Sequence, residues 1–234
     1  MAHYYYFPFH NAPLDEAIEQ TELTVRLKYN LGKAPETRQL KPTNPGKKYD
    51  PQEGVKTVCN VHKRADGSLG FRDAAAGQPL AKVRENDVLL VDGHGVPSGN
   101  FIASDEKSTL TLTHIELAAI LILEGLNDGV VIKMLTCYSG GTWNSNADND
   151  NIFAKKLATL IGKKKENVVV GGYPGTVINT VACAGEKKES NMTPIQLTVV
   201  NEAGDQRLTG KAAIRYYDKN GRLTQRPAAS KSPR

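Results

Sequence analysis

The segment VIKMLTCYSGGT, residues 131–142, joins an apolar run directly to a cysteine and a pair of glycines. A short apolar run that stops at such residues predicts a buried strand, here ending at Cys137. A second run, DVLLVDG at 87–93, stops in the same way before His94, which has a glycine on either side. Continuous apolar runs of this length are typical of strands covered on both faces of a sheet. The two runs therefore predict the centre of an α/β fold.

The residues between these two strands predict a helix. Thr113 and Glu116 have the spacing of a capping box, so we expect the helix to run from about Thr113 to Gly125. Its side chains are apolar almost all round, which predicts a buried helix. A second helix, with an amphipathic pattern, is expected over residues 151–162. Strands that alternate with helices imply a mostly parallel sheet with both faces covered.

Shorter runs of apolar or alternating residues predict the remaining strands of the fold. The candidates are 55–61, 168–175, 195–201 and 211–218. Asp66 and Gly67 form a turn signal that suits a hairpin after the first of these. The sequence NEAGDQ at 201–206 is expected to form the turn between the last two.

The chain divides into three parts by its residue pattern. Residues 1–50 predict an N-terminal extension with an aromatic cluster at 4–9, an extra half-buried strand at 23–29 and a proline-rich loop. Residues 51–217 predict the main α/β domain. Residues 218–234 are basic and end in small polar residues and prolines, which predicts a disordered tail.

The composition is 39% hydrophobic and 24% charged over 234 residues, which is typical of a globular domain. No apolar run approaches the roughly 18 residues that cross a bilayer, and the first residues lack the pattern of a secretory signal. We therefore expect no membrane partner, and either a cytoplasmic location or export as an effector without a readable signal peptide. The cysteines Cys59, Cys137 and Cys183 are widely spaced, which predicts reduced thiols.

The positive charge of the chain is concentrated at its C-terminal end. The formal net charge is +5, and residues 218–234 contribute +4, because five Lys or Arg residues stand against one Asp. The rest of the chain carries only +1. A charge confined to a tail gives the folded part no basic surface, so we expect no nucleic-acid partner. The oligomeric state is left open.

His94 and Cys137 are predicted to lie at the same edge of the sheet. Each follows a buried strand, and one helix separates the two strands, so they form one βαβ unit whose strands point the same way. Neighbouring strands are about 4.8 Å apart, so both side chains can project into one cleft at the carboxyl ends. A thiolate is a strong nucleophile, and an adjacent imidazole can take its proton and later protonate a leaving amine.

Backbone groups beside this pair complete the expected chemistry. The N–H groups of Gly95 and Cys137 are predicted to donate to the oxyanion that develops during acyl transfer. Removing one such donor costs about 3–4 kcal/mol of transition-state stabilisation in well-studied hydrolases. The reaction requires no metal ion and no other cofactor.

The motifs Asp-Gly-His-Gly at 92–95 and Cys-Tyr-Ser-Gly at 137–140 resemble those of a clan of cysteine peptidases. The clan includes caspases, metacaspases, legumain, gingipains and clostripain, and the resemblance covers residues 55–175 in pattern. It implies a caspase-like three-layer α/β/α sandwich with a mostly parallel central sheet. It also implies a dyad in which Cys137 is the nucleophile and His94 the general acid, acting on a protein or peptide substrate.

Four residues are candidates for substrate binding. Asp148 and Asp150, in the loop after the cysteine, are expected either to form an acidic pocket for Lys or Arg or to be solvated. Gly172 and Tyr173, after the next strand, are candidates for substrate backbone contacts by strand addition, as in the clan's peptidases. Caspases and legumain have Ala before the nucleophile where this chain has Thr136, so their residue preference is not transferred.

The sequence therefore predicts a cysteine endopeptidase that hydrolyses peptide bonds through an acyl-enzyme on Cys137. Two lysine-rich segments, 162–167 and 185–190, are candidate self-processing sites if the enzyme prefers basic residues. Two alternatives remain open. One is an interaction or signalling module with a caspase-like fold, and the other is a thiol-dependent transferase that uses the same pair with little proteolysis.

Overall fold

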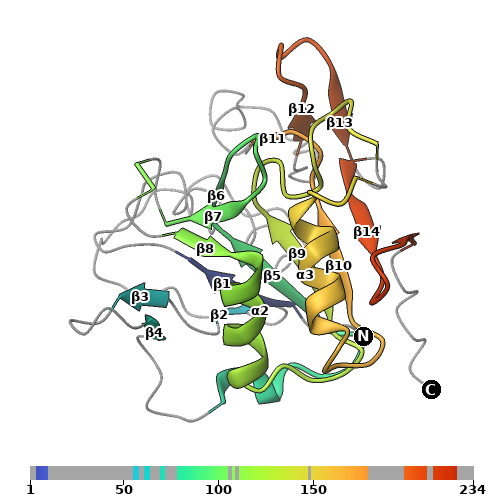
Figure 1. Ribbon diagram of the computed structural model, residues 1–234. Helices are drawn as coiled ribbons and strands as arrows, with labels where there is room; N and C mark the ends of the chain where they lie inside the picture. Colours follow the sequence, from blue (N-terminus) through green and yellow to red (C-terminus); the bar gives the residue numbers. More distant parts are fainter. Residues whose placement is uncertain are drawn as a thin grey trace, which may run out of the picture.

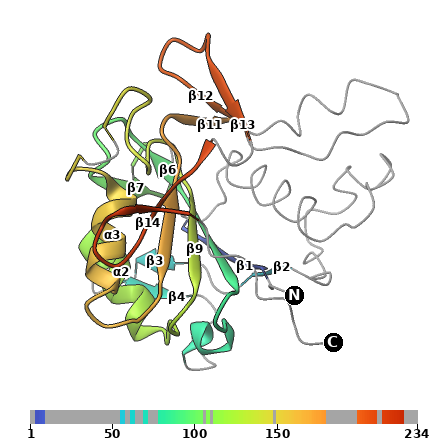
Figure 2. The same ribbon diagram turned by 90° about the vertical axis from the view of Figure 1, so that its right-hand side faces the viewer.

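The computed structural model describes residues 4–9, 55–57, 61–63, 69–71, 78–104, 107–108, 111–146, 149–178, 198–209 and 213–225. These residues form a mixed α/β fold in which a seven-stranded sheet carries two α-helices on one face (Figure 1, Figure 2). Three smaller antiparallel sheets accompany it. The strand expected at 23–29 lies outside the described residues, as do Cys59 and Cys183.

The seven strands run in the order β15-β14-β10-β9-β5-β1-β2 across the sheet. Their bounds are Tyr4–Pro8 (β1), Val55–Thr57 (β2), Val88–Asp92 (β5), Val131–Leu135 (β9), Val169–Gly172 (β10), Arg215–Tyr217 (β14) and Leu223–Thr224 (β15). All pairs from β2 to β10 are parallel, whereas β14 is antiparallel to both of its neighbours. Numbered along the chain, the parallel strands have the order 2-1-3-4-5, one of the two common orders of open doubly wound sheets.

The strands β5 and β9 are neighbours in the middle of the sheet, as the two apolar runs predicted. Their parallel register pairs Val88 with Val131 and Asp92 with Leu135. All five residues of β5 are buried, which confirms that the sheet is covered on both of its faces at this strand.

Two hydrophobic cores lie on the two faces of this sheet, because successive side chains of a strand point to opposite sides. The larger core contains the buried sides of both helices and residues such as Leu89 and Met134. The smaller core, on the opposite face, contains Leu90 and Leu135. The central strands are therefore anchored from both sides, which holds their ends in a defined position.

Helix α2 (His114–Leu123) begins with the predicted capping box. Thr113 Oγ1 accepts from the Glu116 N–H at 3.3 Å, and the Glu116 carboxylate accepts from the Thr113 N–H at 2.8 Å. The expectation that this helix is fully buried is wrong, since Ile115 and Leu123 are 61% and 71% exposed. A helix on the face of a sheet buries one side only, whatever the polarity of its outer side.

Helix α3 (Phe153–Ile161) has the amphipathic character that its sequence predicted. It buries Phe153, Leu157 and Ile161 and packs beside α2, with the Phe153 ring edge-on to His114 at 6.1 Å between centroids. The helix ends at Gly162, as expected. None of the helices in the described ranges is long and apolar enough to span a bilayer.

The smaller sheets and a 3-10 turn complete the described structure. Their elements are β3 (Val61–Lys63), β4 (Leu69–Phe71), η3 (Pro79–Lys82), β6 (His94–Gly95), β7 (Phe101–Ala103), β8 (Thr111–Thr113), β11 (Thr176–Ile178), β12 (Thr198–Val200) and β13 (Arg207–Thr209). The pairing of β3 with β4 confirms the hairpin predicted around Asp66 and Gly67. The turn at 201–206 connects β12 to β13, and not to the strand at 211–218 as expected.

Both ends of the described chain take part in the large sheet. The aromatic cluster at 4–9 supplies β1, an unpredicted strand between β2 and β5. Order also extends past the predicted start of the tail at residue 218, because β15 pairs with β14. Asp218 Oδ1 closes the turn between them by accepting from the N–H groups of Asn220 and Arg222, each at 2.9 Å. Residues 226–234 lie outside the described part.

The orientation of α2 predicts different costs for two leucines that are two residues apart and lie on opposite sides of the helix. Leu121 is fully buried, so Leu121→Ala should lower the free energy of unfolding by about 2–5 kcal/mol. Leu123→Ala is the matched control, because Leu123 is 71% exposed, and its effect should stay within about 0.5 kcal/mol. Chemical denaturation measures both values, and equal losses would contradict the observed orientation.

Candidate active site

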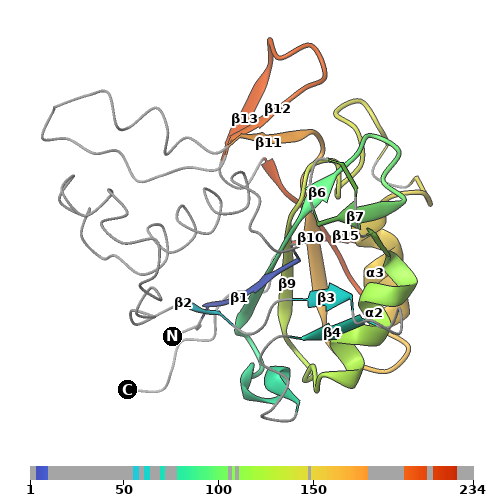
Figure 3. The same ribbon diagram turned by 90° about the vertical axis from the view of Figure 1, so that its left-hand side faces the viewer.

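His94 and Cys137 lie at the same edge of the sheet, at equivalent positions of neighbouring strands. Asp92 and Leu135 are paired at the carboxyl ends of β5 and β9, and each candidate lies two residues further along its chain. His94 opens β6, which turns into the antiparallel hairpin with β7 (Figure 3). Both residues are half-buried, so their side chains are shielded without being closed off from solvent.

The backbone of Gly95 lies directly against the residue proposed as the nucleophile. A Cβ atom added to Gly95 would be 1.9 Å from the Cys137 carbonyl oxygen and 2.7 Å from Cγ2 of Thr136. Only a residue without a side chain fits at this distance. The sequence predicted a role for the Gly95 N–H as a donor to an oxyanion, and the structure adds that the glycine is needed for contact between the two motifs.

The environment of Cys137 favours the neutral thiol in the resting protein. Burial raises the pKa of the Cys137 thiol above its usual range, and the nearby Asp92 carboxylate raises it further. The Val177 N–H donates to Sγ at 3.3 Å and, with the backbone N–H of Cys137, lowers the pKa by a smaller amount. A nucleophilic role for Cys137 would therefore require a base that accepts the thiol proton.

The turn after Cys137 is bonded to the chain that follows β10. The Tyr138 N–H donates to the Gly175 carbonyl at 2.8 Å, and its hydroxyl lies 2.9 Å from the Thr176 hydroxyl. Tyr138 has a φ of 57°, a left-handed conformation that costs a residue with a side chain about 1–2 kcal/mol. These bonds hold the strained residue in place, and strain of this kind gathers at functional sites.

Ser139 fastens the same turn from inside the protein. Its hydroxyl donates to the Thr136 carbonyl at 2.7 Å and accepts from the Tyr173 N–H at 3.1 Å. The Gly140 N–H then donates to the Tyr173 carbonyl at 2.9 Å. Ser139 is 2% exposed, so its role is to support the turn and not to act on a substrate.

Arg215, on β14, holds the chain beyond this turn. Its guanidinium donates to the Gly140 carbonyl at 3.1 Å, to the Ser145 hydroxyl at 3.0 Å and to the Trp143 carbonyl at 3.3 Å. Charged donors form stronger hydrogen bonds than neutral ones. Arg215 thus connects the edge of the sheet to the loop that follows Cys137.

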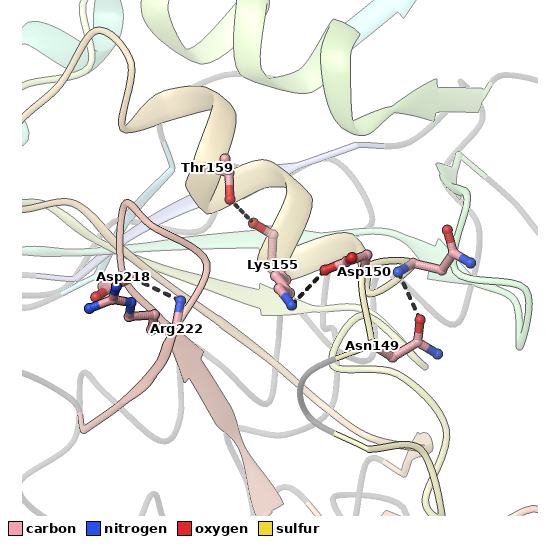
Figure 4. Close-up of polar contacts among 7 residues, drawn as sticks. Asn149, Asp150, Lys155, Thr159, Asp218 and Arg222 are labelled. Carbon is pink, nitrogen blue, oxygen red and sulfur yellow. Dashed lines mark hydrogen bonds and ion pairs between the residues drawn. The ribbon is translucent and has the colours of Figure 1, made fainter.

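The four predicted substrate-binding residues fall into different places. Gly172 is packed against the backbone of Ser139 and Gly140, and Tyr173 is 2% exposed, so both support the cysteine turn. Asp150 is exposed and pairs with Lys155 of α3 at 2.8 Å, which lowers its pKa (Figure 4). Asp148 lies outside the described residues.

Sequence reasoning missed several residues that shape the site. Asp92 belongs to the quoted motif, but its charge gained a role only when folding placed it near Cys137. Ser139 appeared in the sequence only as part of the Cys-Tyr-Ser-Gly motif, and its supporting role left no signal in the pattern. Arg215 is 75 residues from its partner Gly140, and nothing in the strand at 211–218 distinguishes it.

The described residues contain no group of three or more His, Cys, Asp or Glu side chains that could hold a metal ion. A thiol and an imidazole at one sheet edge are the groups available for chemistry here. Together they can perform nucleophilic attack with proton transfer.

Comparison with known proteins leaves the family open. No family model matches the chain. Part of it is similar to a glutamate–tRNA ligase of Nitrosospira multiformis, with 31% identity over 81 residues. That similarity covers 32% of this chain and 17% of the ligase, so the chain spans a small part of the ligase's length. A functional interpretation therefore depends on the geometry of the site.

The contact of Gly95 with Cys137 predicts that Gly95→Ala is poorly tolerated. The added methyl group would overlap the Cys137 carbonyl, and such overpacking typically costs about 1–3 kcal/mol of the free energy of unfolding. Gly93→Ala is the matched control, because a Cβ there would meet its nearest atom, the Ala103 carbonyl oxygen, at 3.2 Å. Denaturation of both variants measures the difference, and equal stability would contradict the close approach.

The proximity of Asp92 to Cys137 predicts the pH dependence of the thiol. Alkylation of Cys137, followed by mass spectrometry of its peptide, should have a midpoint above the ordinary thiol pKa of about 8.5. Asp92→Asn removes a negative charge and should lower the midpoint. Asp87 is a buried carboxyl that directly precedes β5, at the end of the strand away from Cys137. Asp87→Asn should therefore leave the alkylation midpoint unchanged. A shift with Asp87→Asn alone would exclude the proposed coupling.

The raised pKa of the Cys137 thiol also determines how the free energy of unfolding depends on pH. Because its pKa is higher in the folded than in the unfolded chain, its stabilising contribution is complete below about pH 8.5. The contribution is lost as the pH rises through the folded-state pKa. Cys137→Ser should therefore reduce the loss of stability at alkaline pH.

Proposed function

We propose that this protein is a cysteine endopeptidase whose nucleophile is Cys137 and whose general acid and base is His94. The observation that carries the proposal is the register of β5 and β9, with Gly95 in contact with the Cys137 carbonyl. Two motifs that are 43 residues apart thereby meet at the carboxyl edge of a parallel sheet. That edge is where sheets of this kind bind their ligands.

The proposed architecture is the caspase-like three-layer α/β/α sandwich. The parallel strands in the order 2-1-3-4-5 support it, as does the layer formed by α2 and α3. The second hydrophobic core, which includes Leu90 and Leu135, lies on the opposite face and supports a covering layer there as well.

The reaction starts from the neutral thiol that the environment of Cys137 favours. His94 accepts the thiol proton as Sγ attacks the carbonyl carbon of the scissile peptide bond. The N–H groups of Gly95 and Cys137 donate to the oxyanion of the tetrahedral intermediate. The intermediate collapses when the C–N bond breaks and His94 gives its proton to the leaving amine. Water, deprotonated by His94, then attacks the thioester carbon; the C–S bond breaks, the second product leaves as an acid, and His94 returns its proton to Sγ.

The substrate backbone is proposed to lie along β11. This strand forms one edge of its three-stranded sheet, and β12 pairs with its other side. The Val177 N–H donates to Cys137 Sγ, so the edge of β11 that has no strand partner among the described residues faces the nucleophile. An extended peptide added to this edge brings its carbonyl carbon to the thiol. The supporting positions of Gly172 and Tyr173 leave Thr176 and Val177 for such contacts.

The acidic pocket and the self-processing sites are separate parts of the proposal. Asp150 is engaged by Lys155, so Asp148 is the remaining candidate for an acidic pocket in that loop. The segment 162–167 forms the turn after α3, in which the Lys163 and Lys164 N–H groups donate to helix carbonyls. That bonding disfavours cleavage there, which leaves 185–190, outside the described residues, as the candidate for self-processing.

The proposal predicts selective reaction with an electrophilic peptide probe. The probe should label wild-type protein at Cys137, and neither Cys137→Ala nor His94→Ala should react. His114→Ala is the matched control, because His114 is also half-buried but lies on α2, and it should keep full labelling. The labelled residue is identified by mass spectrometry of the peptides.

Other outcomes separate the alternatives. Labelling of Cys59 or Cys183 instead of Cys137 would exclude the proposed nucleophile. Labelling at Cys137 without cleavage of any member of a peptide library would favour a thiol-dependent transferase. No labelling at all would favour an interaction or signalling module. Cleavage of the library defines the residue preferred before the scissile bond.

A further inference from the structure

Two segments of the chain together carry more positive charge than the whole protein, and one of them lies in the folded part, which was expected to have no basic surface. Residues 150–166 contain five lysines and two acidic residues, a formal charge of +3, and residues 218–234 carry +4. Because the whole chain has a net charge of +5, everything outside these two segments is −2. Charge asymmetry of this size between parts of one chain favours an interaction with a polyanion.

The fold brings the described part of the second segment, residues 218–225 with a formal charge of +1, against the first. A Cβ atom on Gly162, at the end of α3, would lie 2.4 Å from Cβ of Lys219. A Cβ atom on Gly221 would lie 2.9 Å from the Thr159 hydroxyl and 3.2 Å from the Lys155 side chain. The turn after β14 therefore rests on α3 (Figure 2, Figure 4). We call the outer side of α3, the turn at 163–165 and the turn at 218–222 the lysine face.

Most cations of the lysine face are available to a partner. Two are neutralised within the protein, since Lys155 pairs with Asp150 and Lys219 with Glu166. Five others form no ion pair with any carboxylate in the described part of the chain. These are Lys156, Lys163, Lys164, Lys165 and Arg222.

Exposed apolar side chains flank the lysine face. Ile115 and Leu123 of α2 are 61% and 71% exposed, and Leu223 of β15 is 54% exposed. Leu223 is paired with Tyr217, which is buried in the core beneath the helices, so Leu223 projects from the same face of the sheet. In the described ranges, these three are the large hydrophobic residues with high exposure, and all belong to the helical side of the molecule.

We propose that the lysine face and its apolar flanks bind reversibly to the surface of an anionic lipid bilayer. Each Lys or Arg near such a surface strengthens binding about fivefold, and exposed leucines gain by entering the interface. A nucleic acid would satisfy the charges, but its phosphate backbone offers no contact for the apolar flanks. The flanks therefore favour lipid, which revises the expectation of no membrane partner, because contact with a bilayer surface needs no spanning segment. The proposal is independent of any peptidase activity.

The placement of acidic groups agrees with an edge-on approach by α3. Glu116 lies on α2, where its carboxylate is held by the Thr113 N–H and hydroxyl, each at 2.8 Å. Glu124 ends the same helix. Within the lysine face, Asp150 and Glu166 pair with Lys155 and Lys219, and Asp218 accepts from the backbone of its own turn. The cations of α3 and of the turns at 163–165 and 218–222 outnumber these carboxylates, so this side of the molecule lies nearest the bilayer, with the apolar side chains of α2 and β15 at its margins.

The test is co-sedimentation of the full chain with vesicles. Vesicles of phosphatidylcholine with phosphatidylserine should bind the wild type at about 0.01 M ionic strength. They should release most of it at about 1 M, where salt screens charge interactions beyond about 3 Å. Vesicles of phosphatidylcholine alone should bind little. Lys163→Gln/Lys164→Gln/Lys165→Gln should lose binding by a factor on the order of 100.

Two further variants separate charge from hydrophobicity. Arg84→Gln/Lys107→Gln/Arg207→Gln removes the same charge from exposed positions in other elements and should bind as the wild type does. Leu123→Ser/Leu223→Ser should lose the binding that remains at high salt. All these positions are exposed or at turns, and circular dichroism confirms that each variant is folded.

Several results would overturn the proposal. If both triple variants lost vesicle binding equally, the binding would depend only on the net charge of the protein and not on the lysine face. Absence of binding to anionic vesicles at low salt would exclude a lipid partner. Binding to a double-stranded DNA fragment without binding to vesicles would make the lysine face a nucleic-acid surface instead.

Discussion

The parallel pairing of β5 with β9 is the constraint on which the candidate site depends. A shift of one residue in this register would turn the side chains of one strand to the other face of the sheet. Hydrophobic cores on both faces prevent the shift, because Leu89 and Leu90 are each buried on opposite sides. Because Asp92 is paired with Leu135, His94 and Cys137 each lie two residues beyond a paired position at the same edge of the sheet. Gly95 then permits a contact that any side chain would block.

The turn after Cys137 shows how a buried strand end becomes an accessible thiol. The left-handed Tyr138 redirects the chain, and its unfavourable backbone conformation is offset by bonds to Gly175 and Thr176. Ser139 and Arg215 secure the turn from two other directions. The position of the sulfur is therefore determined by β9, by the chain after β10 and by β14. Support from several rigid elements is what precise catalytic geometry requires.

The lysines at 163–165 and the candidate active site lie at opposite ends of α3, whereas Lys155 and Lys156 lie in its first turn. The helix begins where the Ala154 N–H donates to the Ser139 carbonyl, next to the cysteine turn. It ends at Gly162, beside Lys219 and the start of the path into β10. A protein bound to a surface through the lysines at 163–165 would therefore keep the carboxyl edge of the sheet open to solvent. Recruitment and catalysis would use separate parts of the molecule.

Local pattern was sufficient for the elements that frame the site. The apolar runs determined β5 and β9, the capping box determined the start of α2, and amphipathic periodicity determined α3, because each depends on residues close together in sequence. Only the tertiary structure decided which side of α2 is exposed, that β1 enters the sheet and that residues 218–225 return to α3. Arg215 and Asp92 acquired their roles in the same way. All of these depend on contacts between distant residues, which composition and periodicity do not record.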